Sequence, residues 1–199
     1  MKPAGRKGRN SGGTRDYSRE TDLRRRIGTR DQLRTVLVAT NGQSTERSYL
    51  LALKQEPWVR PRVVVVVERG SPIDMARGAA RRRQRDDFDE AWGVCDVDHY
   101  EAAQAEAEAA ALGVRLVWSN PCFEVWLLLH HVDCSGYLKN ADKVHEKLRR
   151  AVKNWDKTAL NFNDFRDGVE NAVVRAQRLG PAPDRNPSTA VWQLIDTLR

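Results

Sequence analysis

The sequence predicts an α/β fold, in which a parallel sheet is flanked by helices and followed by a helical C-terminal extension. Two observations lead to this prediction. Four short apolar runs rich in β-branched residues alternate with stretches of helical pattern, as in sheets built from β-α-β units. Residues 139–199, which follow, carry helical patterns alone. We therefore expect a basic, disordered arm at 1–30, an α/β core at 31–135 and a helical extension packed on that core at 136–199.

Four runs have the length and composition of buried strands. They are expected at Thr35–Thr40, Arg62–Glu68, Glu90–Cys95 and Val114–Trp118. The second run, RVVVVVE, is apolar on both faces, which is typical of a central strand in a parallel sheet. The sequence thus predicts that this strand has neighbours on both sides.

Helices are expected between and after these strands. The pair Ser71-Pro72 indicates a helix start, because serine caps a helix well and proline fits its first turn. Gly113 is placed to end the third helix. The expected helices cover residues 44–55, 71–84, 99–112, 119–131, 140–154, 167–179 and 187–198.

Composition favours a cytoplasmic protein with no membrane segment. No run of 18 apolar residues occurs, and the basic N-terminus lacks the apolar stretch of a secretory signal. The three cysteines, Cys95, Cys122 and Cys134, are odd in number and form no C-x-x-C pair. Neither a disulfide framework nor a cysteine-type zinc site is therefore expected, which fits a reducing compartment.

The positive charge is concentrated at the N-terminus. The chain has 34 basic and 27 acidic residues, and ten of the former but only three of the latter fall within residues 1–30, so the remainder is neutral. Arg24, Arg25 and Arg26 are the densest part of this arm. Such an arm can neutralise phosphates, so nucleic acid is the expected partner. The alternatives are a solubilising tail or contact with an acidic protein.

Two aspartates follow the third expected strand. Ligands of open α/β sheets bind beyond the carboxyl ends of the strands, which is where Asp96 and Asp98 should lie. Two carboxylates spaced in this way can converge on Mg²⁺ or Mn²⁺, which prefer oxygen ligands. The alternative is a turn, or a helix cap formed by Asp98.

Two glutamates could join them. Glu46 lies in the first turn of the helix after the first strand, whose end can neighbour that of the third strand. Its alternative role is a favourable charge at a helix N-terminus. Glu124 lies in an apolar helix, where a carboxylate is costly unless it is paired or bound to metal. It is either a residue of the site or part of a solvated helix face.

Basic and histidine clusters complete the candidates. Arg81, Arg82 and Arg83 are either a phosphate clamp or a solvated helix end. His130 and His131 with Cys134 lack a fourth zinc ligand, so His130 is expected either to be a core histidine or to support a residue of the site.

Four segments resemble the RloB-like family. They read VLVATNGQSTERSYL, GVCDVDHY, SNPCFEVWLLLHH and NPSTAVWQLIDTL, and the similarity covers residues 34–199. The resemblance implies a Toprim-like parallel sheet and an association with restriction and phage-defence loci. Toprim folds support Mg²⁺-dependent cleavage or transfer of phosphodiester bonds.

The resemblance also implies roles for residues. Asp96 and Asp98 match the family's Asp-x-Asp, and Glu46 matches the acid of a Thr-Glu pair. Asn41 and Gly42 match a Glu-Gly pair and form the expected cofactor-binding turn. The asparagine departs from the family's glutamate, which would be a general acid/base or a metal ligand. An amide cannot take a proton at neutral pH. Either Glu46 or another acid replaces it, or this copy is catalytically weak.

Three functions are consistent with these observations. The first is a Mg²⁺- or Mn²⁺-dependent nuclease, or nuclease-related effector, in phage defence, with Glu46, Asp96, Asp98 and Glu124 at its catalytic site. The second is a catalytically weak subunit that binds nucleic acid or a partner defence protein through the basic arm. The third is a sensor that releases a partner. A Walker-type phosphate loop is absent from the sequence, so ATP hydrolysis is not expected.

Overall fold

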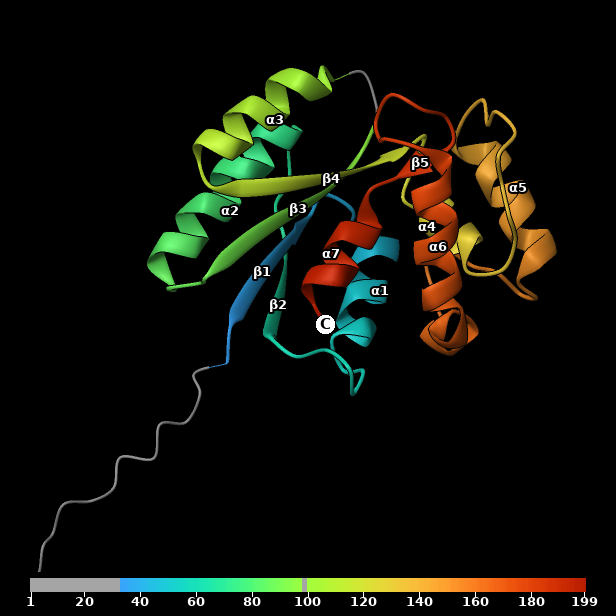
Figure 1. The fold of residues 1–199 in the computed structure, drawn as a ribbon, viewed down its shortest axis with the longest axis horizontal. Helices are drawn as coiled ribbons and strands as arrows, with labels where there is room; N and C mark the ends of the chain where they lie inside the picture. Colours follow the sequence, from blue (N-terminus) through green and yellow to red (C-terminus); the bar gives the residue numbers. More distant parts are fainter. Residues whose placement is uncertain (1–32, 98–99) are drawn as a thin grey trace, which may run out of the picture. The chain divides into compact units, whose positions relative to one another are not determined.

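The computed structural model of the protein describes residues 33–97 and 100–199 (Figure 1). It contains a five-stranded sheet with the order β2-β1-β3-β4-β5. The first four strands are parallel, and β5 pairs antiparallel with β4. The strands are β1 (Thr35–Thr40), β2 (Arg62–Val67), β3 (Glu90–Asp96), β4 (Val114–Asn120) and β5 (Ser188–Thr189).

Helices cover both faces of this sheet, which confirms the predicted α/β class (Figure 1). Those between the parallel strands are α1 (Thr45–Leu53), α2 (Pro72–Arg85) and α3 (Ala102–Ala111). Those after β4 are α4 (Glu124–Leu129), α5 (Ala141–Ala151), α6 (Val169–Leu179) and α7 (Val191–Thr197), with the 3₁₀ turns η1 (Phe162–Asp164) and η2 (Arg166–Gly168). The helical C-terminal end was predicted.

The two faces of the sheet have separate hydrophobic cores. Successive side chains of a strand point to opposite faces, so Val36 and Val38 join one core while Leu37 and Ala39 join the other. All four are fully buried. The first core is large and aromatic and includes side chains of α1, α4, α6 and α7, whereas the second packs α2 and α3 through small residues. Helices on both sides of position 135 thus share one core.

Two features of the sheet differ from the sequence expectation. Strand β2 was predicted to be central, but it lies at the edge and pairs only with β1 among the described strands. Its apolar pattern reflects helices packed on both faces and gives no information on how many strands flank it. The short strand β5 was not expected, and it adds Ser188 beside Asn120 in an antiparallel register.

Most helix boundaries follow local signals. At the start of α2, Ser71 Oγ accepts from Asp74 N, and the Asp74 carboxylate accepts from Ser71 N, which is a complete capping box. The expected helix over 119–131 begins later, at Glu124, because β4 continues through Asn120. Within residues 33–97 and 100–199, every helix is too short or too polar to cross a lipid bilayer.

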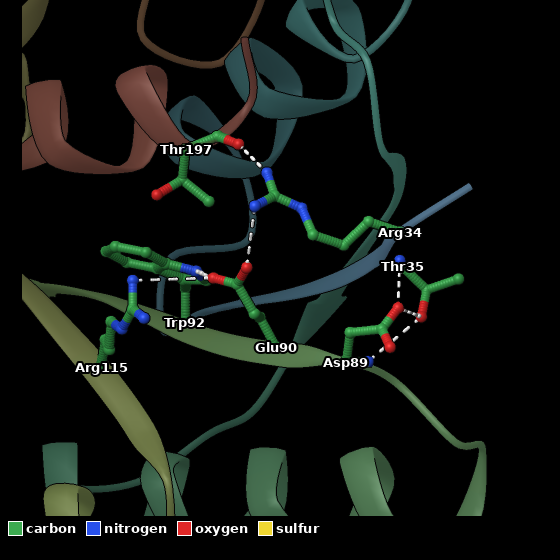
Figure 2. A network of polar contacts seen from close by, with 7 residues as sticks. All are labelled: Arg34, Thr35, Asp89, Glu90, Trp92, Arg115 and Thr197. Carbon is green, nitrogen blue, oxygen red and sulfur yellow. Dashed lines mark hydrogen bonds and ion pairs between the residues drawn. The ribbon is translucent and has the colours of Figure 1, made fainter. Parts of the chain in front are cut away.

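The amino end of the sheet carries a network of paired acids (Figure 2). Glu90 is within 3.1 Å of Arg34 Nη1 and 3.6 Å of Arg115 Nη1, and it accepts from Trp92 Nε1 at 3.2 Å. Arg34 also donates to the carbonyl of Thr197, which ties β1 to α7. Each oxygen of Glu90 thus has a cationic partner.

The neighbouring acid, Asp89, is held by hydrogen bonds. Its Oδ2 accepts from Thr35 N at 2.7 Å and from Thr35 Oγ1 at 2.9 Å (Figure 2). These bonds lower the pKa of Asp89, and the nearby Arg34 lowers it further. Asp89 is therefore stabilised in its charged form.

Candidate functional site

A pocket of about 250 Å³ lies at the opposite end of the sheet, beyond the carboxyl ends of β1 and β3. These two strands pair directly, so the segments that follow them meet, as the sequence predicted. The pocket is lined by Asn41, Gly42, Glu46, Pro72, Met75, Val94, Cys95, Asp96 and Tyr100. Three of the predicted site positions and the first aspartate of the Asp-x-Asp therefore face one space.

Asp96 is the last residue of β3 and is partly buried. Its strand position is fixed from the side of β4, because Asp96 pairs in register with Ser119 and the next residue, Val97, donates its N–H to the Ser119 carbonyl at 2.9 Å. Asp96 is thereby held at the carboxyl end of the sheet. The second aspartate of the motif, Asp98, lies outside the described residues.

Glu46 reaches the pocket from the first turn of α1. Its carboxylate lies against Gly42, and a Cβ atom at position 42 would force the carboxylate to move. Burial raises the pKa of Glu46, and the negative charge of Glu124 raises it further, although a backbone hydrogen bond and Lys157 act in the opposite direction. Glu46 is thus an acid whose charged form is disfavoured.

Glu124 lies on α4 with a side chain that is 11% exposed. His145 Nε2 of α5 lies 3.9 Å from its Oε1. Burial raises the pKa of the neighbouring Cys122 thiol, and the charges of Glu124 and Asp96 add to this effect. The predicted site position Glu124 is therefore within electrostatic range of both Glu46 and the surroundings of Asp96, although it does not line the pocket itself.

Asn41 closes the pocket on the side of β2. Its Nδ2 donates to the Gly70 carbonyl at 3.1 Å, and Thr40 Oγ1 donates to the Gly42 carbonyl at 2.9 Å. A glutamate at position 41 could not make this donation when ionised, because a carboxylate only accepts. The asparagine at position 41 therefore also holds the turn after β1 in place.

A family model gives the chain its place among known proteins. The model described as RloB-like protein matches residues 36–198. The chain belongs to the RloB-like family. None of the curated proteins and none of the solved structures compared with it matches. The match spans β1 through α7, so the pocket lies within the family's shared region. The Toprim relationship stays a prediction.

Three of the arginines predicted to bind nucleic acid in this RloB-like chain lie on α2. Helix α2 begins beside the pocket at Pro72 and runs toward the amino end of β3, so Arg81, Arg82 and Arg83 lie away from Asp96. Arg82 pairs with Glu68. Arg82 is therefore engaged within the fold, and phosphate binding by the three arginines stays a prediction.

Their other contacts are internal as well. Arg83 donates to the carbonyls of Phe88, at 3.3 Å, and Gly113, at 3.0 Å, whereas Arg81 is exposed. Nucleic-acid binding by this cluster stays a prediction, and the predicted Arg24, Arg25 and Arg26 lie outside the described residues.

His130 is a core histidine, as predicted. Its Nε2 is 3.2 Å from Tyr49 Oη and its Nδ1 is 2.7 Å from the Phe165 carbonyl. Burial lowers the pKa of His130 to about 3. Among residues 33–97 and 100–199, no three His, Cys, Asp or Glu side chains are grouped so that they could hold a metal ion, and Asp98 falls in the gap.

Sequence reasoning missed the partners that reach the acids from the C-terminal half. His145 approaches Glu124 from α5, and Lys157 lies near Glu46, where its carbonyl accepts from Thr45 Oγ1 at 3.1 Å. Nothing in their local pattern marks them, since both belong to segments that read as ordinary polar helix and loop. Only the packing of the C-terminal helices brings them to the acids.

Proposed function

We propose that this RloB-like chain is a metal-dependent nuclease, or a nuclease-related effector, that acts on phosphodiesters of nucleic acid in defence against phage. The observation that carries the proposal is the raised pKa of Glu46, caused by burial and by Glu124, in the pocket that also contains Asp96. Burial beside another negative charge disfavours the ionised form of Glu46. Perturbed acids in a cleft favour a functional site over a structural one.

The acids of the pocket are chemically suited to a hard divalent cation. Asp96 and Asp98 would hold Mg²⁺ or Mn²⁺, because these ions prefer oxygen donors such as carboxylates. When bound, the ion would supply positive charge that stabilises the charge developing on the scissile phosphate. The described donors are Asp96 and Glu46, and Asp98 is needed to complete the set.

Glu46 is the best candidate for moving a proton. A glutamate with a raised pKa lies closer to neutral pH and exchanges protons more readily there. Glu124 contributes by its charge, which raises the pKa of Glu46, and His145 lies within reach of Glu124. Cys122 is unsuited to act as a nucleophile, because burial raises the pKa of its thiol and disfavours the thiolate.

The test is a cleavage assay on a double variant. Asp96→Ala with Asp98→Ala should lower Mg²⁺- or Mn²⁺-dependent cleavage of DNA or RNA by about 100-fold or more, because the cation would lose both ligands. Asp142→Ala with Asp184→Ala removes the same charge from two exposed positions and should leave the rate unchanged. Full cleavage by the first double variant contradicts the proposal.

A second function is favoured by Asn41. A neutral amide bonded to the Gly70 carbonyl stands where the resembling family has an acid, as expected of a subunit that binds nucleic acid or a partner protein without cleaving. Asn41→Glu should then create activity that the wild type lacks. Deletion of residues 1–30 should reduce both the affinity for nucleic acid and its salt dependence, if the basic arm supplies the binding.

A further inference from the structure

A second hollow of about 360 Å³ adjoins the carboxylate pocket at the edge of the sheet. It is lined by Gln43, Arg47, Val67 and Arg69. The pocket takes residues 41, 42 and 46 from the segment between β1 and α1, and the hollow takes residues 43 and 47 from the same segment. The segment between β1 and α1 therefore lies between the carboxylate pocket and the hollow that contains two arginines.

An acidic and a basic residue directly after β2 point to opposite faces of the sheet. Glu68 N donates to the Thr40 carbonyl at 3.0 Å, so the chain stays paired to β1 for one residue beyond the strand. Successive side chains there point to opposite faces. Glu68 turns toward α2 and pairs with Arg82, whereas Arg69 turns toward Gln43 and Arg47. Arg69 therefore lines the hollow, whereas Glu68 does not.

The positive charge of the hollow is not neutralised by the part of the chain that the structure describes. Its lining contains no carboxylate, and neither Arg47 nor Arg69 forms an ion pair with a described residue. With its amide oxygen turned toward Arg69, Gln43 accepts from Nε at 2.9 Å. A neutral acceptor orients a guanidinium and leaves its charge available, and both arginines are exposed.

We propose that Arg47 and Arg69 bind a backbone phosphate of a nucleic-acid strand, next to the phosphate that occupies the carboxylate pocket. Guanidinium groups bind phosphate oxygens through paired N–H donors. The strand would then cross the turn at Gly42 and Gln43, with the reacting phosphate on one side and a flanking phosphate on the other. This inference rests on the proposed function and adds that the substrate is a polynucleotide held by its backbone, without sequence readout.

The test measures oligonucleotide binding by the full chain in the absence of divalent ions. For each variant, the logarithm of the binding constant is plotted against the logarithm of the salt concentration. Arg47→Gln with Arg69→Gln should reduce the slope for single-stranded oligonucleotide by about 0.7, since the two arginines contact one phosphate and each lost phosphate contact accounts for roughly this amount. Arg47→Lys with Arg69→Lys retains both charges and should retain the slope.

The matched control lies on the same edge strand. Arg60→Gln with Arg62→Gln removes two exposed arginines at the amino end of β2 and should leave the slope unchanged. Equal losses in the two Gln pairs, an unchanged slope in the first pair, or no oligonucleotide binding by the wild type would overturn the inference. A variant that loses affinity for inorganic phosphate alone would also overturn it, because the ligand would then be a small anion.

This readout is independent of catalysis. Since no divalent ion is present, a wild-type chain that never cleaves can still show the predicted difference in slope. That combination would retain the phosphate-binding hollow and reject the nuclease. If the Arg47→Gln, Arg69→Gln chain still cleaves and its slope is unchanged, the nuclease is retained and the phosphate-binding hollow is rejected.

Discussion

The two ends of the sheet hold the same kind of side chain in opposite electrostatic conditions. At the amino end, Glu90 lies between Arg34 and Arg115, so its charge is balanced (Figure 2). At the carboxyl end, Glu46 and Asp96 share a pocket, and Glu124 adds negative charge nearby. The acid at the amino end is therefore paired with two arginines, whereas the pocket at the carboxyl end brings acids together.

The pKa shifts of the two ends have opposite signs and opposite consequences for folding. The pKa of Asp89 is lowered, so its charged form stabilises the folded protein. The pKa of Glu46 is raised, so its charged form destabilises the folded protein. The comparison implies that removing charge at the amino end costs stability, whereas removing it at the pocket should reduce the activity proposed for the pocket.

The largest effect is expected from a pair of isosteric changes, one at each end. Asp96→Asn should lower divalent-ion-dependent cleavage by about 100-fold or more, because an amide is a weak metal ligand. Glu90→Gln should leave cleavage unchanged. Cleavage rates and urea unfolding are measured on both variants. A Glu90→Gln chain that cleaves more slowly than Asp96→Asn would contradict the proposed difference between the two ends.

The next largest effect concerns the paired end alone. Glu90→Ala should lower the unfolding free energy by about 1–3 kcal/mol, because Arg34, Arg115 and the Trp92 N–H lose their acceptor. Glu90→Gln retains an acceptor and should lose less. Urea unfolding measures both, and an Ala variant as stable as the wild type would show that the network is dispensable.

A smaller effect, of opposite sign, is expected at the pocket. Glu46→Gln should raise the unfolding free energy on the order of 1 kcal/mol at neutral pH, because it removes a carboxylate whose ionisation the fold disfavours. The gain should be complete above the raised pKa of Glu46 and vanish as the pH falls below its ordinary value of 4.5, where the wild-type carboxyl is protonated in both states.

The check is urea unfolding of Glu46→Gln and wild type across that pH range. Glu146→Gln is a suitable control, because Lys143 lowers the pKa of that exposed glutamate, and its loss should not stabilise the protein at any pH. If Glu46→Gln is less stable than the wild type at neutral pH, then the ionised Glu46 carboxylate stabilises the folded protein, and the prediction is wrong.

The sequence predicted the parts of this comparison that depend on local pattern. Runs of buried β-branched residues located the four parallel strands, and the turn after β1 and the aspartates after β3 located the pocket, because parallel strand ends lie at one edge. The edge position of β2 could not be predicted, since helix cover on both faces produces the same apolar pattern as a central strand.

The charge balance at each end depends on residues distant in the chain. Glu90 meets Arg115 from the next strand, and Glu124 meets His145 from α5. Arg82 was predicted to belong either to a phosphate clamp or to a solvated helix end, and the fold pairs it with Glu68. A run of arginines in a sequence does not show which of them the fold uses internally, because that is decided by tertiary packing.

The smallest effect is expected at Asp89, which is exposed and held by hydrogen bonds to Thr35. Asp89→Asn still offers an oxygen to Thr35 N, so the protein should lose only a little stability at neutral pH. The wild-type advantage is present above the ordinary aspartate pKa of 3.8 and is lost as the pH falls through the lowered pKa, where the native carboxylate takes up its proton. Thermal midpoints of the two chains should therefore converge in acid. If they diverge there instead, the Asp89 charge is not what stabilises the amino end, and the contrast with Glu46 would rest on Glu90 alone.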